Sequence, residues 1–446
     1  MLLIKDTIAA IATATGKGGI GIIRISGAKS YTIATKIVHH ELKPRYAHFL
    51  NFYDNKNQIV DNGIALYFKA PHSYTGEDVV ELQAHGGPII LQLLLEIVLN
   101  HGARLANPGE FTERAYLNNK IDLMQAEAIA DMIDATSRQA VQSASRSLQG
   151  QFSQRIQRLL DQLVTLRVHV EAAIDFPEEE HDFLEDAEIK DNLNIVTKAL
   201  EDILHVAKQG ALLREGTEIV IAGKPNAGKS SLLNALAGKE SAIVTEIEGT
   251  TRDTLSEYIQ IKGVPIHIID TAGLRITQDV VETEGIKRAL AKLKTADHIL
   301  MIIDICEKGG KDTACDFIEE MPENIPITYV YNKIDLDSHH YQNHDNCLYL
   351  SAKYNIGIDK LREYLLKAIG YQQTSEGTFT ARKRHIDALE QALSNLKQGQ
   401  AHFYNKAGEL LAEALNLAQQ DLGLITGKFS ADDLLGEIFS QFCMGK

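Results

Sequence analysis

The chain has 446 residues, enough for about three domains that each hold a core of their own. Its formal net charge of −15 excludes a broad basic face for nucleic acid, so any RNA contact must be local or shared with a partner. The 4 cysteines are scattered, which excludes a disulfide scaffold or a zinc site and indicates the reduced thiols of a cytoplasmic protein.

The first 118 residues have the pattern of an α+β domain. Asp6 interrupts an N-terminal apolar run that is already too short for a secretory signal, and we expect a strand there. Short β-branched runs at residues 21–26 and 63–68 lie between glycine turns, as in a small sheet. No stretch approaches the ~20 uninterrupted apolar residues of a membrane span, so we expect no stable membrane insertion.

Helical spacing replaces this pattern after the first domain and returns near the end of the chain. Residues 175–186 and 372–380 are expected to be solvated connections, with metal binding by the acidic first stretch as a minor alternative. A middle domain inserted into a helical domain explains this order, because the ends of such an insert lie close together at a surface. The apolar residues that share a helix face are Leu159, Leu163, Leu166 and Val170 in the first part, and Ile386, Leu389, Leu393 and Leu396 in the second.

The middle domain opens with a candidate phosphate loop. Residues 223–230 (GKPNAGKS) follow a buried-strand pattern at 218–222 and precede a helical pattern at 231–236. Glycines let the backbone curl around phosphates, so that N–H groups and a helix N-terminus point at negative charge. Lys229 would reach the β- and γ-phosphates and Ser230 the Mg²⁺. Taken alone, the string also fits a glycine-rich turn.

Two further stretches fit a sensor of the γ-phosphate. Residues 245–253 (TEIEGTTRD) lie where a first switch must sit, and Thr251 can give its hydroxyl to Mg²⁺. Asp270 ends an apolar run, where its carboxylate can hold the metal through water, and Gly273 can give its N–H to the γ-phosphate. Leu274 stands where Ras-like GTPases place a glutamine that orients water, so another group must do this.

Two last strings, residues 332–335 (NKID) and 351–353 (SAK), select the base. The Asp335 carboxylate suits guanine because it can accept two N–H groups, whereas adenine lacks the exocyclic amine there. Buried groups that the wrong base leaves unpaired give roughly 10⁴-fold rejection. The four strings together predict a Ras-like α/β P-loop domain that binds GTP. The predicted GTP-binding residues are Asn226, Ala227, Gly228, Lys229, Ser230, Ser231, Thr245, Glu246, Ile247, Glu248, Gly249, Thr250, Thr251, Asp270, Thr271, Ala272, Gly273, Asn332, Lys333, Asp335, Ser351, Ala352 and Lys353.

Charged residues near the predicted switches and a C-terminal cysteine remain without a role on composition alone. Each is more often a solvated loop charge than a catalyst, and a frayed tail is the plain interpretation of the chain end. Ser430 with Asp433 nevertheless fits a helix start that would carry the terminal residues. The residues concerned are Arg252, Asp253, Arg275, Glu282 and Cys443.

The strings at 223–230, 249–253 (GTTRD), 270–275 (DTAGLR) and 443–446 (CMGK) resemble the bacterial and organellar tRNA uridine-5-carboxymethylaminomethyl modification GTPases over essentially the whole chain. The methionine of the last string departs from the small or branched residue usual in that family. The resemblance implies a homodimer whose G domains meet in the presence of K⁺. It also implies that Ser230 and Thr251 bind Mg²⁺, that Asn226, Thr245, Ile247 and Thr250 bind K⁺, that Glu282 orients the attacking water, and that Arg252, Asp253 and Arg275 support the switches.

The same resemblance implies a folate site in the N-terminal domain. A 5-formyl-tetrahydrofolate-type donor would be lined by Arg24, Glu81, Lys120 and Lys446, with Cys443 needed for modification. An FAD-dependent partner that uses NADH would share the chemistry on uridine 34 of certain tRNAs. The implied domains are 1–118 for folate binding and dimerisation, 119–215 for the first helical part, 216–371 for the inserted G domain, and 372–446 for the second helical part.

Two other classes of protein stay open on the residues alone. One is a ribosome-assembly GTPase, although the C-terminal helices show neither a KH-like Gly-x-x-Gly element nor a basic tail. The other is a folate-dependent enzyme whose G domain only regulates oligomerisation. Folate binding by the N-terminal residues as a dimer would separate these two classes.

Overall fold

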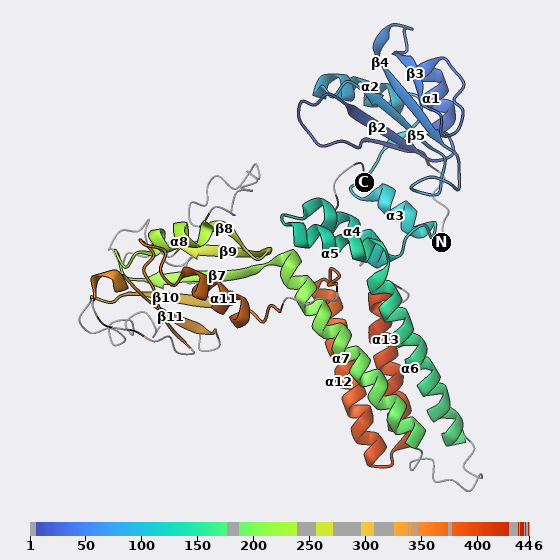
Figure 1. Ribbon diagram of the computed structural model, residues 1–446. Coiled ribbons are helices and arrows are strands. Elements are labelled where there is room, and N and C mark those ends of the chain that lie inside the picture. Colours follow the sequence, from blue (N-terminus) through green and yellow to red (C-terminus); the bar gives the residue numbers. More distant parts are fainter. Residues whose placement is uncertain are drawn as a thin grey trace, which may run out of the picture. The chain divides into compact units, whose positions relative to one another are not determined.

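The computed structural model describes residues 6–175, 187–238, 256–270, 296–306, 325–337, 339, 341, 346–372, 377–427, 436, 438–440, 442 and 445 (Figure 1). Its contacts divide the chain into two compact units. Unit 1 holds Met1–Ala130, Leu148–Glu185 and Gln398–Lys446, and unit 2 holds Asp131–Ser147 and Asp186–Lys397. Each unit is therefore built from segments that are distant in the sequence.

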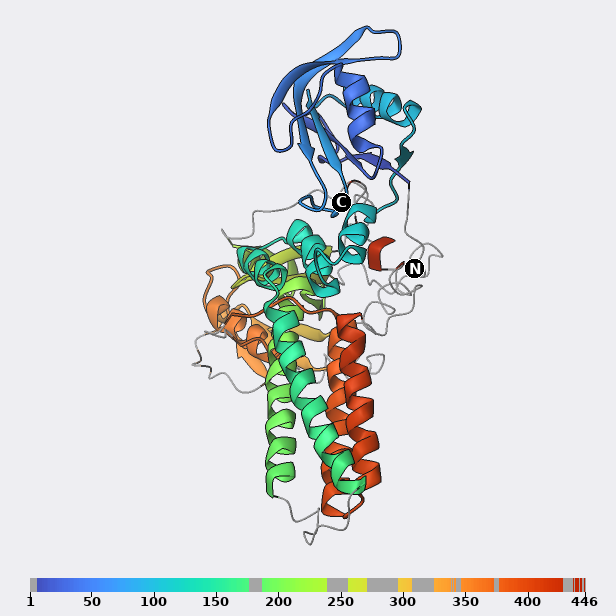
Figure 2. The same cartoon turned by 90° about the vertical axis from the view of Figure 1, so that its right-hand side faces the viewer.

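Unit 1 contains a six-stranded sheet in the order β3-β4-β5-β2-β1-β6. Its neighbouring strands are antiparallel, except that β1 and β6 are parallel. Two helices cover one face, where buried Ile25 and Leu82 meet Ile33 and Leu94 (Figure 2). The strands are β1 (Ile8–Ile11), β2 (Gly21–Ser26), β3 (His48–Tyr53), β4 (Ile59–Phe68), β5 (Val79–Ala84) and β6 (Arg104–Leu105), and the helices are α1 (Ser30–Val38), α2 (Pro88–Asn100) and, after the sheet, α3 (Glu110–Leu117).

A buried ionic cluster of Arg114, Glu110, Asp6, Glu77 and Arg104 joins α3 to the start of the chain. The Arg114 side chain, 2% exposed, donates hydrogen bonds to Glu110 Oε1 at 2.8 Å and Asp6 Oδ1 at 2.7 Å, and it pairs with Glu77 at 3.2 Å. Arg104 from β6 reaches Glu110 at 2.7 Å. Because a buried guanidinium is stable only when its charge and its N–H groups are matched, these carboxylates allow α3 to pack under the sheet.

Helices after α3 contribute to both units. In unit 1, α6 and α13 pack together, and Arg167 donates to Asn416 at 2.9 Å and to Gln419 at 2.7 Å. In unit 2, Lys208 on α7 pairs with Glu390 on α12 at 2.6 Å. The predicted apolar face on α6 is buried, whereas Ile386 and Leu393 on α12 are only half-buried. These helices are α4 (Leu123–Asp134), α5 (Arg138–Leu148), α6 (Gln151–Asp175), α7 (Ala187–Glu215), α12 (Lys383–Tyr404) and α13 (Gly408–Thr426).

Unit 2 contains a second six-stranded sheet in the order β12-β11-β10-β7-β9-β8. All neighbouring pairs are parallel except β8 with β9, as in doubly wound nucleotide-binding domains. One face packs against α8 and α11 through buried Ile221, Leu232 and Leu361. The elements are β7 (Thr217–Gly223), α8 (Lys229–Ala237), β8 (Ser256–Ile261), β9 (Val264–Asp270), β10 (His298–Asp304), β11 (Ile327–Asn332), a 3-10 turn at Ile334–Leu336, β12 (Cys347–Tyr349) and α11 (Ile358–Ala368).

The described end of the return segment 372–380 corrects one expectation. We predicted a solvated connection there, but Phe379 is 0% exposed and Thr380 is buried. A Cβ atom added to Gly210 of α7 would lie 1.9 Å from the Phe379 carbonyl oxygen, so the missing side chain provides the slot that the segment occupies. The Thr380 N–H also donates to Ser147 Oγ at 2.9 Å.

Several expectations concern residues outside the described part of the chain. These are the N-terminal apolar run as far as residue 5, the acidic connection 176–186 and the C-terminal helix start at Ser430 and Asp433. Within the described ranges, no helix is both long enough and apolar enough to span a bilayer.

The ionic cluster makes the stability of unit 1 depend on pH. Burial opposes ionisation of Glu110, but hydrogen bonds from Arg104, the Asn107 N–H and Arg114 outweigh it and hold the pKa of Glu110 below its ordinary 4.5. Its contribution to stability is therefore fully present above pH 4.5 and is lost as the pH falls through the lower folded-state pKa.

We therefore expect Glu110→Gln to lower the free energy of unfolding of unit 1 by roughly 3 kcal/mol at neutral pH, because the buried arginines lose a charge partner. Urea unfolding at neutral pH and near pH 4 measures this, and the deficit narrows at the lower pH. Exposed Glu41→Gln, the control, changes stability by less than about 0.5 kcal/mol. An equal deficit at both pH values would contradict the assignment.

Candidate functional site

The loop between β7 and α8 is shaped for close approach of a ligand to the backbone. Gly223 has a φ of +148° and Gly228 a φ of +94°, and Asn226 between them lies in the left-handed region at 66°. A Cβ atom on Gly228 would lie 2.2 Å from Asn332 Nδ2. This backbone therefore requires glycine at Gly228, both for its conformation and for the space beside it.

Lys229 at the start of α8 closes over this loop. Its Nζ donates to the carbonyl oxygens of Gly223 at 2.7 Å and Lys224 at 2.9 Å, and the residue is buried. The N-cap position is Gly228, which has no side chain to cap the helix, and a helix N-terminus attracts anions through its first-turn N–H groups. Ser230 and Ser231 are exposed in the same turn. A cation, helix N–H groups and hydroxyls thus meet where the sequence predicts phosphates and Mg²⁺.

Asn332 at the end of β11 joins the phosphate loop to the base-reading strings. Its Nδ2 donates to the Ala227 carbonyl oxygen at 2.9 Å, and its Oδ1 accepts the Ala352 N–H at 3.0 Å. The residue is 2% exposed. Ser351 Oγ donates to Asp335 Oδ1 at 2.5 Å, which orients that carboxylate. The structure therefore brings together the predicted phosphate and guanine residues that it describes.

Sequence reasoning missed Asp304, which ends β10. Its Oδ2 accepts a hydrogen bond from Lys333 Nζ at 2.6 Å. Burial opposes ionisation of Asp304, but the contacts from Lys333 and the Cys306 N–H outweigh it and hold its pKa below the ordinary range. The signal in the sequence was available, because Asp304 ends an apolar run just as Asp270 does. Asp304 therefore holds the side chain of Lys333, the lysine of the NKID string. The lysine of the SAK string, Lys353, instead places its Nζ 5.1 Å from the centre of the Tyr354 ring.

The predicted metal and switch residues are only partly described. Asp270 ends β9 and pairs with Ile221 of the parallel strand β7. Its backbone therefore lies at the carboxyl ends of the strands, where the phosphate loop also begins. Among the described residues no group of acidic, histidine or cysteine side chains could hold a metal alone. The predicted residues that lie outside the description are Thr245, Glu246, Ile247, Glu248, Gly249, Thr250, Thr251, Arg252, Asp253, Thr271, Ala272, Gly273, Arg275, Glu282, Cys443 and Lys446.

The candidate folate residues lie in unit 1. Arg24 and Glu81 stand opposite each other on β2 and β5, and Arg24 Nη2 lies 2.9 Å from Glu81 Oε1. Arg24 also lies 5.5 Å from the centre of the Tyr74 ring. Lys120 donates to the Pro71 carbonyl oxygen at 3.0 Å. Arg24 and Glu81 are thus neighbours on the sheet face away from α1 and α2, whereas their role in folate binding stays a prediction.

The C-terminal segment reaches this same pair. Arg24 Nη1 donates to the Gly445 carbonyl oxygen at 3.3 Å. Gly445 has a φ of +89°, and a Cβ there would lie 2.2 Å from the Ile11 carbonyl oxygen. Phe439 and Phe442 are buried in a cluster with Leu123. The described terminal residues therefore dock on unit 1, which corrects the plain interpretation of a frayed tail.

The fold and the nucleotide site define a P-loop guanine-nucleotide-binding protein. A family model for the MnmE helical domain matches residues 123–443, and one for the GTP-binding protein TrmE N-terminus matches residues 7–120. The chain belongs to the MnmE family of tRNA modification GTPases. The predicted fold class, with an α+β N-terminal domain, a helical domain and an inserted P-loop domain, is confirmed, and so is the predicted GTP hydrolase.

Curated relatives agree over the whole length. The tRNA modification GTPase MnmE of Francisella philomiragia is 55% identical over 99% of this chain and 99% of its own. That of Francisella tularensis subspecies holarctica is 56% identical over the same shares. Among solved structures, Aquifex aeolicus Era bound to GDP and aluminium fluoride is 25% identical over 40% of this chain and 66% of its own, with a TM-score of 0.28. The predicted boundaries at 118, 215 and 371 stay predictions.

The steric fit at Gly228 gives a direct test of the loop. Gly228→Ala adds a methyl group 2.2 Å from Asn332 Nδ2 at a φ of +94°, so the loop must distort. A strain of about 1–3 kcal/mol lowers GTP affinity roughly 5- to 150-fold. Titration with a fluorescent GTP analogue measures this. Asn234→Ala at the exposed far end of α8 is the matched control and keeps native affinity; equal affinities for both variants would refute the loop's role.

Proposed function

We propose that this chain is a K⁺-dependent GTPase that acts with an FAD-dependent partner to install the 5-carboxymethylaminomethyl-type group on uridine 34 of certain tRNAs. The observation that carries the nucleotide part is the position of Asn332, which holds the phosphate loop and the base-reading string in one site. The tRNA part is supported by relatives with that activity in their names, 55% identical over 99% of the chain.

The described residues have clear tasks in GTP binding. Lys229 would exchange its loop carbonyls for the β- and γ-phosphates, since an ammonium gains more from phosphate oxygens than from neutral ones. Asp335, oriented by Ser351, would accept the N–H groups of guanine. Ser230 and Thr251 would hold Mg²⁺, which when bound neutralises charge on the phosphates.

The hydrolytic step is assigned to residues around the γ-phosphate. Glu282 would orient the attacking water, and Arg252, Asp253 and Arg275 would support the switches. Asn226, exposed beside the phosphate loop, would hold K⁺ with the carbonyl oxygens of Thr245, Ile247 and Thr250. A monovalent cation there would neutralise charge that develops as the phosphoryl group leaves.

The N-terminal unit would bind the one-carbon donor. Arg24 and Glu81 already form a pair at 2.9 Å, and the Gly445 carbonyl oxygen lies 3.3 Å from Arg24. A pterin edge pairs with a carboxylate and a glutamate tail with cations, so this pair, Lys120 and Lys446 would line a 5-formyl-tetrahydrofolate-type ligand. The docked terminal segment would hold Cys443 at that ligand. We propose that the chain forms a homodimer for this step.

The K⁺ and water-orienting roles predict a specific kinetic pattern. Replacing KCl by NaCl slows GTP hydrolysis at least about 10-fold, because the smaller ion fits the oxygen cage poorly. Glu282→Ala lowers the hydrolysis rate about 100-fold while GTP affinity is kept. Phosphate release and nucleotide titration measure the two quantities. Exposed Glu363→Ala on α11 is the control. Equal rates in the two salts would remove the K⁺ assignment.

The coupled tRNA function predicts a change in wobble nucleosides. Cells without the protein lose the 5-aminomethyl-type uridine modification, as measured by mass spectrometry of tRNA nucleosides. The intact chain and Cys306→Ser restore it, whereas Cys443→Ser and Asp270→Ala do not. An unchanged nucleoside profile would leave a GTPase with another output, and ribosome assembly would then be the leading alternative.

A further inference from the structure

The hairpin of β8 and β9 makes a fitted contact with the corner between α4 and α5. Gln260 Nε2 donates to the Thr136 carbonyl oxygen at 2.6 Å. At the turn, Gly263 has a φ of +82°, and a Cβ there would lie 2.2 Å from Gln139 Oε1. The turn backbone therefore lies directly on the Gln139 side chain. All of these residues belong to unit 2.

The β8–β9 hairpin connects the predicted switch residues with the turn that contacts the α4–α5 corner. β8 begins shortly after the predicted first switch at 245–253, and β9 ends at Asp270, the predicted γ-phosphate sensor. The two strands pair without a register shift from Ser256 opposite Ile269 to Ile261 opposite Val264. β9 also pairs with β7, so the hairpin forms one edge of the six-stranded sheet, and its continuous pairing couples the switch end of the two strands to the turn.

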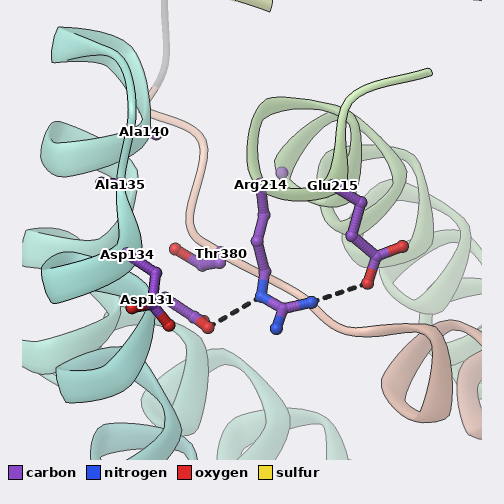
Figure 3. A pocket seen from close by; sticks show the side chains of 8 residues that line it. Asp131, Asp134, Ala135, Ala140, Arg214, Glu215 and Thr380 are labelled. Carbon is purple, nitrogen blue, oxygen red and sulfur yellow. Dashed lines mark hydrogen bonds and ion pairs between the residues drawn. The ribbon is translucent and has the colours of Figure 1, made fainter. Parts of the chain in front are cut away.

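The α4–α5 corner also makes ion pairs with residues that lie just before and just after the G domain in the sequence. Asp131 near the end of α4 is buried and accepts hydrogen bonds from Arg214 at 2.7 Å and Arg382 at 2.9 Å. Arg214 lies in the last turn of α7, and it also pairs with Glu215 at 2.7 Å (Figure 3). β7 and the phosphate loop follow directly. The corner is thus bonded both to the helix that enters the G domain and to the segment that returns from it.

A cavity lies beside the corner. Its volume is about 230 Å³, and it is lined by Asp131, Asp134, Ala135, Ala140 and Arg214 among others (Figure 3). The pocket is partly open to the surface, so the helices beside it are packed less tightly there than in a closed core. The contact of Gln260 with Thr136, the ion pairs of Asp131 and the pocket therefore all lie at the α4–α5 corner.

We propose that the β8–β9 turn is the contact through which nucleotide-dependent change in the G domain reaches α4 and α5, with Gln260 and Gln139 as its positioning residues. The inference rests on the proposed function, in which GTP hydrolysis changes the conformation of the rest of the chain. The proposal depends on one arrangement: the predicted phosphate sensor Asp270 and the contact with the corner lie at opposite ends of one continuously paired hairpin.

Hydrogen–deuterium exchange on the full-length chain tests this without tRNA or partner. Exchange of residues 131–147 is compared with GDP and with GDP plus aluminium fluoride, both in KCl. In the native chain these amides differ between the two states. In Gln260→Ala, and separately in Gln139→Ala, that difference is lost, while residues 217–238 keep theirs and nucleotide affinity is unchanged. The unchanged G-domain response excludes simple unfolding as the cause.

A second set of variants checks the steric fit. Gly263→Asn tolerates the positive φ but places a Cβ where the exposed Gln139 side chain lies, so Gln139 must move aside and the response of residues 131–147 is weakened. Lys262→Gln, exposed in the same turn, retains the response. A native chain with no response, or Gln260→Ala and Gln139→Ala variants that both keep it, overturns the proposal. Failure to modify tRNA with an intact response would instead overturn only the proposed function.

Discussion

The nucleotide site depends on the two hydrogen bonds of the Asn332 amide. One side of the amide holds the Ala227 carbonyl of the phosphate loop, and the other holds the Ala352 N–H of the loop after β12. The residue is 2% exposed, so losing it would leave buried backbone groups unpaired at about 1–3 kcal/mol each. The ends of parallel strands bring these two loops close together, and the Asn332 amide then joins them directly.

Burial distinguishes the arginines of unit 1 that only stabilise its packing from those that are exposed enough to contact a ligand. Arg114 is 2% exposed and surrounded by carboxylates, so it serves to pack α3. Arg24 is 22% exposed and holds Glu81 and the Gly445 carbonyl at the surface of the sheet. Both arginines occur in short polar interruptions of apolar runs, so nothing in the sequence separates them. Their different surroundings come from tertiary packing and support a binding role for Arg24 alone.

Much of the fold followed from local pattern. Local sequence predicts the strands at residues 21–26 and 218–222, because β-branched runs favour extended backbone. It also predicts the turns at Gly223 and Gly228, because glycine readily adopts a positive φ. The Asp304 and Lys333 pair and the burial of Phe379 were not predicted, and the docking of Gly445 beside Arg24 was expected only from the family resemblance. Each joins segments distant in sequence, and a polar or glycine-rich stretch has the same composition whether it is buried or solvated.

The way the G domain joins the helices explains why an internal contact is needed for communication. Gln209 of α7 donates to the Gly370 carbonyl oxygen at 2.8 Å and accepts the Gln372 N–H at 2.7 Å. The chain leaves the G domain beside the helix that leads into it, so both ends of the insert are fixed at one place. The phosphate loop lies at the opposite end of β7 from this joint, so a change there must pass along the strands of the sheet. The β8–β9 turn lies next to the entering end, where a Cβ atom on Gly216 would be 2.4 Å from the Pro265 carbonyl oxygen. It also contacts the α4–α5 corner through Gln260, so it can carry that change while the joints stay closed.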